Sequence, residues 1–221
     1  MTTDEAVANP ATPPPAGLRE RKKQRTRNAL VRSALELFTR QGYERTTVDE
    51  IAEAVEVSQR TFFRYFANKE EVAFASQESA ECHFFAALCG RPAGEAPMTA
   101  LRQAILDAWG TMGDAIEQMV PPQLHMRMYR LIESTPSLLA AHLRRTAELE
   151  ERLAREIARR EGLDIDTDPR PRVVVAMFGG VIRVAGKMWG EGEDDSTVTL
   201  RDLTAFHLDY VGPALAEQWD K

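Results

Sequence analysis

Basic side chains gather at one end of the chain, between Leu18 and Arg32, and their chemistry suits a polyanionic partner. Seven Lys and Arg residues stand there against one acid, Glu20. Residues 17–70 carry a net charge of +4 and residues 71–221 carry −8, within a total of −6. Ammonium and guanidinium groups neutralise phosphates, and this term supplies most of the affinity for nucleic acid. The charge asymmetry therefore indicates a polyanion partner for one end only, with a merely solvated helix face as the alternative.

Two short helices are predicted directly after this basic segment. Thr47 and Glu50 have the spacing of a capping box, which begins one helix over 47–55. Ser58 caps the next helix, which is predicted over 59–66. Two such helices with a tight turn between them indicate a helix-turn-helix, whose second helix presents its N-terminal half to base edges in the major groove.

The residues of this segment also resemble a known family. The stretch Gly42-Tyr43-x-x-Thr46-Thr47-Val48-x-x-Ile51-Ala52-x-x-Val55-x-Val57-Ser58-x-x-Thr61-Phe62-Phe63-x-Tyr65-Phe66-x-Asn68-Lys69-Glu70 resembles the DNA-binding signature of the tetracycline-repressor (TetR) family. The resemblance covers about Leu18–Val72. It implies a homodimeric transcription regulator, by family habit a repressor, with a ligand pocket and a dimer interface in its C-terminal helices.

The resemblance also implies roles for individual side chains. Those expected to face phosphates are Thr47, Phe63, Tyr65 and Lys69, and those expected nearest to bases are Gln59, Arg60 and Arg64. Thr61 is expected to touch the DNA backbone or a thymine methyl group, and the basic run, with Lys23 and Arg25, is expected to contact DNA. The residue types agree, since Arg pairs with guanine and Gln with adenine. Two positions depart from the family pattern: Glu56 stands where the turn usually has glycine, and Phe63 lacks the hydroxyl of the common tyrosine, so a packing role is equally open to it.

Apolar residues recur every three or four positions along most of the chain, which predicts an all-α fold. The expected helices are nine: 18–41, 47–55, 59–66, 68–88, 98–119, 122–135, 137–160, 171–190 and 198–219. Residues 1–16 hold four prolines and are expected to form a disordered tail. The expected domains are a helix-turn-helix domain over 17–68 and a helical ligand-binding and dimerisation domain over 69–221.

Methionine and aromatic residues at helical spacing in the second domain are candidates for a ligand cavity. They are Trp109, Met112, Met119, Met126, Met128, Tyr129, Met177 and Phe178. Such a stripe is also common in a plain core, so both interpretations stay open. Because methionine fills adaptable apolar sites, a cavity here would suit an apolar ligand.

Small and aromatic residues on the last two helices are candidates for a subunit interface. They are Gly179, Gly186, Phe206 and Tyr210. Glycines let helices approach closely, and a two-half operator requires a two-fold dimer. The alternative is a weak buried helix.

Other classes of function find little support. The sequence has no Gly-rich phosphate loop, nucleophile elbow or His-Glu metal motif, so neither an enzyme, a metal nor a cofactor is expected. Cys82 and Cys89 lie about 10 Å apart on one expected helix, beyond disulfide reach. No stretch reaches the roughly 18 apolar residues of a membrane span, and no signal peptide is recognisable, so a cytoplasmic protein is expected. The competing hypotheses are a helical enzyme, and a helical protein-binding adaptor or small-molecule-binding protein without DNA specificity.

Overall fold

The computed structural model describes residues 17–194 and 196–216, without the side chains of 111–118 and 212–216, and this part of the chain is helical with no strand. Its ten helices are α1 (Leu18–Gln41), α2 (Val48–Glu53), α3 (Gln59–Phe63), α4 (Lys69–Ala73), α5 (Ala75–Cys89), α6 (Pro97–Met119), α7 (Pro122–Ser134), α8 (Pro136–Glu161), α9 (Arg170–Glu191) and α10 (Thr197–Ala216). The all-α class is confirmed. The expected tail over 1–16 and the end of the last helix at Trp219 lie outside the described residues.

The expected count of nine helices was wrong because the helix over 68–88 is divided. Phe74 ends α4 with φ −101° and ψ 6°, and α5 begins at the next residue. The Phe74 side chain is fully buried. Its burial in the core beneath α1 accounts for a bend at this position that helical periodicity does not predict.

The short helices begin where their capping residues predict. The Thr47 hydroxyl accepts a hydrogen bond from the Glu50 amide (3.2 Å), and the Glu50 carboxylate accepts one from the Thr47 amide (2.8 Å). The Ser58 and Asn68 side chains cap α3 and α4 by accepting hydrogen bonds from the amides of Thr61 and Glu71. The second short helix is shorter than expected, since α3 ends at Phe63 and continues as a hydrogen-bonded turn to Phe66.

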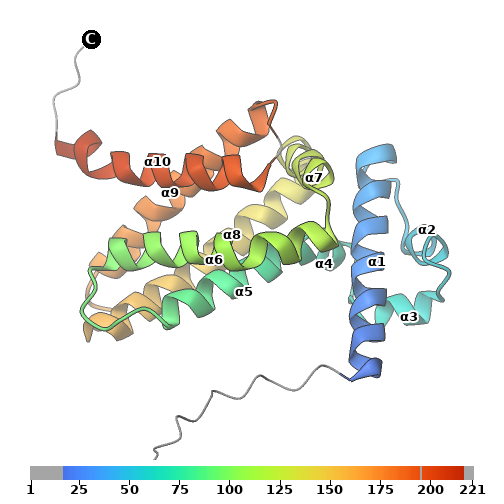
Figure 1. Ribbon diagram of the computed structural model, residues 1–221, viewed down its shortest axis with the longest axis horizontal. Helices are drawn as coiled ribbons and strands as arrows, with labels where there is room; N and C mark the ends of the chain where they lie inside the picture. The colour runs from blue at the N-terminus through green and yellow to red at the C-terminus, as the bar shows by residue number, and fades with distance from the viewer. Residues whose placement is uncertain (1–16, 195, 217–221) are drawn as a thin grey trace, which may run out of the picture.

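The helices form a small N-terminal unit of α1–α3 beside a larger helical body (Figure 1). In the body, α5 packs on α6, and α9 packs on both α8 and α10. Ser137 of α8 donates to Glu44 in the loop after α1 (2.5 Å), which joins the body to the N-terminal unit. Arg144 of α8 donates to Glu70 of α4 (2.8 Å).

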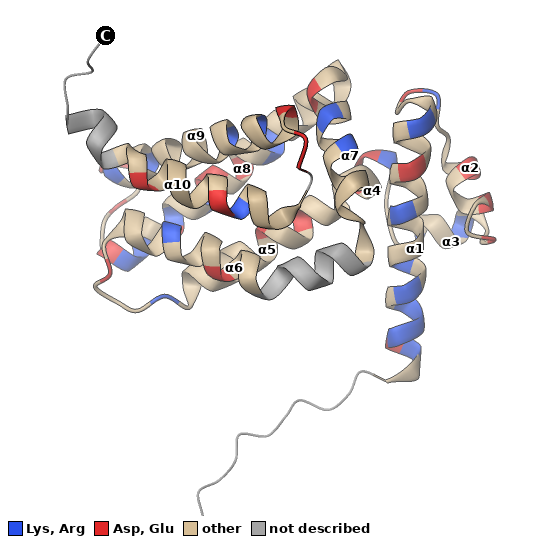
Figure 2. Cartoon of the chain, turned by 45° about the horizontal axis from the view of Figure 1, so that its top comes forward, with Lys and Arg blue, Asp and Glu red and all other residues tan. Residues whose placement is uncertain are grey.

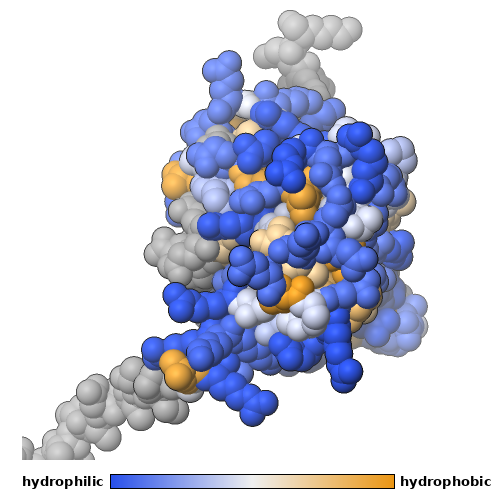
Figure 3. All heavy atoms as spheres, turned by 90° about the vertical axis from the view of Figure 1, so that its right-hand side faces the viewer, coloured by the Kyte–Doolittle hydropathy of each residue, from blue (hydrophilic) through white to orange (hydrophobic). Residues whose placement is uncertain are grey.

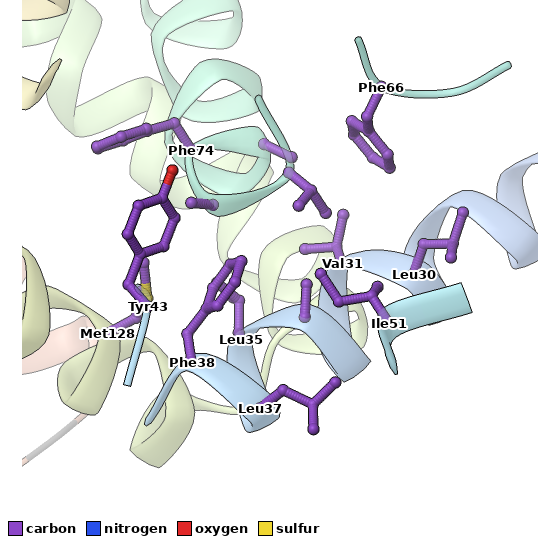
Figure 4. Close-up of a cluster of buried hydrophobic side chains, with 14 of the residues drawn as sticks. Leu30, Val31, Leu35, Leu37, Phe38, Tyr43, Ile51, Phe66, Phe74 and Met128 are labelled. Carbon is purple, nitrogen blue, oxygen red and sulfur yellow. The ribbon is translucent and has the colours of Figure 1, made fainter. Parts of the chain in front are cut away.

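Two clusters of buried apolar side chains hold the molecule together. The first, here called the N-terminal core, joins Leu35 and Phe38 of α1 to Phe74, to Met128 of α7 and to Leu138 of α8 (Figure 4). The second, here called the body core, is built from α5, α6, α8, α9 and α10, with Phe84, Leu153 and Phe178 among its members. The N-terminal core thus crosses the expected domain boundary at 68/69 and reaches into α7 and α8.

Among the described residues, helix α9 is long and apolar enough to cross a membrane, by length and composition only. The sequence analysis counted only uninterrupted apolar residues and therefore did not predict that this helix is apolar enough to span a membrane. In the fold, α9 packs against α6, α7, α8 and α10, and its Arg183 pairs with Glu150 of α8. Only 28% of its most apolar stretch is buried, so α9 has a packed side and an exposed side, and one such helix is weak evidence for a membrane span.

Candidate nucleic-acid interface and ligand cavity

The turn between α2 and α3 is built around Glu56, which has a left-handed backbone with φ 56°. Its amide donates to the Glu53 carbonyl (2.9 Å), and the Val57 amide returns to the Ala52 carbonyl (3.0 Å). This is a helix C-terminal turn of the kind that glycine usually completes. The Cβ of a non-glycine residue makes this positive φ unfavourable by about 1 kcal/mol.

Helix α3 presents its polar side chains to solvent while Phe62 anchors it from beneath. Phe62 is fully buried, whereas Gln59, Arg60 and Arg64 are exposed. Phe63 is 49% exposed and meets the Phe62 ring edge-on, with centroids 5.6 Å apart. The first turn of α3 therefore offers an amide and a guanidinium, and Arg64 follows at its end.

The basic run lies along the exposed N-terminal half of α1, on the same unit as α3 (Figure 2). Lys23 and Arg25 are exposed, and Lys23 makes only a loose ion pair with Glu20 (3.7 Å). Arg27 is half-buried, with its guanidinium 5.1 Å from the centroid of the Phe66 ring. The surface of this end of the molecule is mostly hydrophilic with scattered apolar atoms (Figure 3).

Two of the expected phosphate-facing groups are already hydrogen-bonded within the protein. The Thr47 hydroxyl accepts a hydrogen bond from the Glu50 amide and donates one to the Glu50 carboxylate, within the capping box of α2. The Lys69 ammonium donates to the carbonyls of Tyr43 (2.9 Å), Glu44 (3.4 Å) and Thr46 (3.4 Å), and it lies 4.3 Å from the centroid of the Tyr43 ring. Lys69 thus holds the loop that follows α1 against the start of α4. Tyr65 is half-buried against the N-terminal core, with the Arg64 guanidinium 5.2 Å from its ring centroid.

A cavity of about 440 Å³ lies between the two cores. Ala73, Met128 and Ile132 of the N-terminal core and Phe84 and Phe178 of the body core contribute to its wall. The remaining apolar part of the wall comprises Ala80, Ile105, Trp109, Tyr129, Leu139, Leu143, Leu149, Leu153, Val175, Ile182 and Leu200. A cavity of this size and character is typical of a site for a small apolar molecule.

Several polar side chains also line the cavity, and most already have partners. Glu150 of α8 pairs with Arg183 of α9 (2.9 Å). Gln77 donates to Glu81 (2.8 Å), and burial raises the pKa of the Glu81 carboxyl above its usual value. Burial lowers the pKa of His125, so the His125 imidazole is held uncharged.

The structure brings together only part of the expected ligand-binding set. Trp109, Met128, Tyr129 and Phe178 line the cavity. Among the described lining residues Met126 and Met177 are absent: Met126 is buried elsewhere on α7, and Met177 is half-buried on α9. Met119 packs in the N-terminal core, and the side chain of Met112 lies outside the described residues. Sequence reasoning missed His125 and His142, because it tested the histidines only as metal ligands.

The expected interface residues fall into two groups. A Cβ on Gly179 would lie 2.3 Å from Glu150, and one on Gly186 would lie 3.3 Å from the Tyr129 hydroxyl. These glycines therefore allow close packing inside the subunit, and the structure does not place them on an outer face. Phe206 and Tyr210 are 57% and 58% exposed on α10, and their rings lie 5.1 Å apart.

Further exposed apolar side chains accompany that ring pair on α9 and α10. They are Val184, Met188 and Val198. We call these three residues, with Phe206 and Tyr210, the α9–α10 apolar face. Val173, near the start of α9, is exposed as well. Exposed apolar side chains mark a surface for another protein where they form one contiguous patch.

No group of His, Cys, Asp and Glu able to hold a metal ion occurs among the described residues. Cys82 and Cys89 are both free and both exposed on α5. The acidic segment after α9 is organised locally, with Asp194 accepting a hydrogen bond from the Ser196 amide (2.9 Å).

Comparison with known proteins finds matches for both the N-terminal helix-turn-helix and the helical body. Residues 30–75 match the family model described as bacterial regulatory proteins, tetR family, and residues 95–216 match the model described as MftR C-terminal domain. The chain is 50% identical over 209 residues to the HTH-type transcriptional regulator TcmR of Streptomyces glaucescens, covering 95% of this chain and 92% of that one. It is 25% identical over 175 residues to the DNA-binding transcriptional repressor TetR of Mycobacteroides abscessus, covering 72% of this chain and 83% of the relative.

Solved structures show the same fold at low sequence identity. A SmeT–triclosan complex aligns with a TM-score of 0.57 at 16% identity, covering 90% of this chain and 100% of the other. A transcriptional regulator from Aquifex aeolicus VF5 aligns with a TM-score of 0.53 at 15% identity, covering 84% of this chain and 99% of the other. Together with the family models and the 50% identical relative, the helix-turn-helix and the helical body assign the chain: it belongs to the tetR family of bacterial regulatory proteins and is a DNA-binding transcriptional regulator.

Proposed function

We propose that the protein is a homodimeric repressor of a palindromic operator and that a small, largely apolar ligand releases it from DNA. The observation that carries this proposal is the pairing of two features in one chain. One end has an exposed reading helix, α3, beside the exposed basic half of α1. The body has an apolar cavity of about 440 Å³ whose wall includes residues of the core beneath α1.

In the DNA complex, we assign base contacts to Gln59, Arg60 and Arg64, because these polar side chains of α3 and the turn after it are exposed. Thr61, half-buried beside them, contacts the DNA backbone or a thymine methyl group. The phosphate contacts come from Lys23, Arg25 and Tyr65. Phe63 adds apolar contact at the edge of α3.

Two expected phosphate ligands receive a different assignment. Thr47 has its hydroxyl in the capping box, and we assign it the role of fixing the start of α2. Lys69 has its ammonium on three backbone carbonyls, and we assign it the role of positioning the loop beside the reading unit. Thr47 and Lys69 thus affect DNA binding by positioning neighbouring residues and not by contacting DNA themselves.

The dimer forms through the α9–α10 apolar face, with the same patch on both copies, as two-fold symmetry requires. Each copy then presents one α3 to one half-site, and the half-sites lie about one helical turn of DNA, or a multiple, apart. Ligand in the cavity favours a dimer conformation in which this spacing is lost. The dimer works in the bacterial cytoplasm and lies at the nucleoid when it is bound to DNA.

The experiment is selection of random duplex DNA by the purified protein, with binding followed against salt concentration. We expect a palindrome and a steep loss of affinity with salt. Gln59→Ala or Arg60→Ala should then lose about 1–3 kcal/mol of discrimination at single base positions, symmetrically in both half-sites. Glu36→Ala, on the exposed side of α1 and outside helix α3, is the control and should leave the selected sequence unchanged.

A selection that enriches no sequence from a folded, dimeric protein would overturn the proposal. In that case an adaptor that uses its basic end to contact acidic protein surfaces becomes the better hypothesis. A palindrome without any change in the Arg60→Ala selection would instead remove Arg60 from the base-reading set.

A further inference from the structure

The first two turns of α1 project from the rest of the molecule. Every residue of Leu18–Arg25 is exposed, and the first buried residue of α1 is Leu30. The chain is nonetheless helical here, since the Gly17 carbonyl accepts hydrogen bonds from the amides of Glu20 (2.9 Å) and Arg21 (3.1 Å). We call Leu18–Arg25 the projecting segment. Burial of apolar side chains does not explain why α1 extends this far, so the explanation lies in the charges of the segment.

The charges of the projecting segment are nearly all unpaired. It holds five basic side chains and one acid, and Lys23 forms a loose ion pair with Glu20 (3.7 Å). The other four basic side chains have no ion-pair partner among the described residues. Most arginines of the helical body, by contrast, pair with a carboxylate. Like charges four positions apart on a helix repel each other, so a polyanion bound along the projecting segment would stabilise it.

The projecting segment points away from the surface proposed for dimerisation. Two residues after the segment, the Arg27 guanidinium lies 5.1 Å from the centroid of the Phe66 ring, in the turn that follows α3. From this point the segment extends past α3 on the side opposite α9 and α10 (Figures 1 and 2). A second copy that packs on the α9–α10 apolar face lies on the α9 and α10 side of the molecule. The projecting segments of the two copies therefore point away from each other, toward the outer ends of the bound DNA.

We propose that Arg19, Arg21 and Lys22 bind phosphates of double-stranded DNA outside the palindrome, on the outer flank of each half-site. This inference rests on the proposed function, because the dimer places the two projecting segments on the operator. Phosphate contacts neutralise charge without reading bases, so the flanks need no common sequence. The helical rise gives the projecting segment a length of about 12 Å, which equals about four base pairs at about 3.4 Å each. The bound DNA is therefore about four base pairs longer at each end than the part whose sequence is read.

The first test varies the length of the DNA. The selected palindrome is placed in duplexes with flanks of random sequence, from none to about eight base pairs at each end, and fluorescence anisotropy gives the affinity. For the wild-type protein we expect the affinity to rise about tenfold as the flanks lengthen and to level off at about four base pairs per end. The slope of log affinity against log salt should be steeper by about three to five units on the flanked duplex, because each copy adds about three phosphate contacts.

Three alanines remove the phosphate contacts and keep the helix. The triple variant Arg19→Ala, Arg21→Ala and Lys22→Ala should bind the bare and the flanked palindrome with similar affinity, since alanine favours a helix but has no charge. Because the three positions are exposed, the fold should persist, and circular dichroism checks this. The charge-preserving variant Arg19→Lys, Arg21→Lys and Lys22→Arg should keep the gain from flanks, since either cation neutralises a phosphate.

The matched control removes three exposed charges from α8, α9 and α10. Arg155→Ala, Arg170→Ala and Arg201→Ala change the net charge by the same amount as the alanine variant of the projecting segment. This control should keep both the gain from flanks and the steeper salt slope. A control that loses the gain as well would overturn the proposal, because the overall charge and not the projecting segment would then govern the effect.

The proposal is also overturned if flanks do not raise the affinity of the wild-type protein, if the alanine variant keeps the gain, or if the charge-preserving variant loses it. The last result would indicate base contacts by arginine in place of phosphate contacts. A protein that selects a palindrome but gains nothing from flanks keeps the proposed repressor function and loses only this inference. A protein that selects no sequence loses both, and an acidic protein surface then becomes the partner that the projecting segment fits.

Discussion

His142 and Phe74 stack face to face, with ring centroids 6.4 Å apart and planes inclined by 12°. The two rings belong to different parts of the molecule, since His142 lines the cavity and Phe74 is buried in the N-terminal core. Phe74 is also the residue at which α4 gives way to α5. The His142 ring therefore connects the cavity wall to the core that carries α1.

The position of His142 predicts a loss of stability in mild acid. Its pKa is lowered by burial in the folded protein, so the unfolded chain binds a proton at a higher pH than the folded one. The stabilising contribution is complete above the unfolded pKa of about 6.5 and is lost as the pH falls toward the folded value. Urea unfolding should show that His142→Phe loses less stability than the wild-type protein between about pH 7.5 and pH 5.5.

His125 titrates in the same direction and Glu81 in the opposite one. Both groups are present in the wild-type protein and in His142→Phe, so the difference between the two pH profiles is assigned to His142. Equal profiles for the wild type and His142→Phe would show that this imidazole is not held neutral by the fold.

Lys69→Met separates a positioning role from a phosphate contact. Methionine keeps an apolar stem beside Tyr43 and removes the ammonium that binds three carbonyls. We expect the free energy of unfolding to fall by about 1–2 kcal/mol. Chemical denaturation measures this loss, and the salt dependence of DNA binding should stay unchanged. A salt slope smaller by about one unit would restore the phosphate contact that the family resemblance implies.

Glu56→Gly should stabilise the protein, because glycine adopts the left-handed φ of 56° without the steric cost of a Cβ. Part of the gain is offset by the greater freedom of glycine in the unfolded chain, so we expect about 0.5–1 kcal/mol. Thermal and urea unfolding measure the change. Glu53→Gly, at the end of α2, is the control and should destabilise by about 1 kcal/mol. A destabilised Glu56→Gly would mean that the carboxylate makes a contact worth more than the strain.

The capping residues predict the helix starts because each cap is a local arrangement. Thr47, Ser58 and Asn68 each bond a backbone amide within three residues, so sequence spacing alone contains the geometry. The break at Phe74 has another origin, because its ring is buried in the N-terminal core and contacts the His142 ring and the Arg145 guanidinium of α8. No local pattern predicts such a break.

The ligand-facing residues could be predicted only in part for the same reason. Helical spacing identifies an apolar stripe but not which neighbouring helix covers it. Tyr129 faces the cavity while Met126, three positions earlier on α7, does not. Gly179 and Gly186 likewise permit close packing, but only the fold reveals that Glu150 and Tyr129 occupy the space that their missing side chains leave.

Arg25→Ala should weaken binding to all DNA sequences about equally and reduce the slope of log affinity against log salt by about one unit. Arg25 is exposed in the basic run, so the change removes one phosphate partner without disturbing the core. Fluorescence anisotropy of labelled duplexes at several salt concentrations gives both quantities. Arg155→Ala removes an exposed charge from α8, where Arg155 pairs with Glu151 (3.1 Å), and should leave the slope unchanged. If Arg25→Ala keeps the wild-type salt slope, Arg25 does not contact a DNA phosphate.

Phe206→Glu tests the α9–α10 apolar face as the dimer interface. Two-fold symmetry brings the face of one copy onto the same face of the other, so a single substitution buries two carboxylates among apolar side chains. Sedimentation should show monomers at concentrations at which the wild-type protein is dimeric, and affinity for the full palindrome should fall toward that for one half-site. Phe206→Leu keeps an apolar side chain and should remain dimeric. Because Phe206 is 57% exposed in the subunit, the fold of the monomer should persist, and circular dichroism checks this. A dimeric Phe206→Glu protein would assign the subunit contact to another surface.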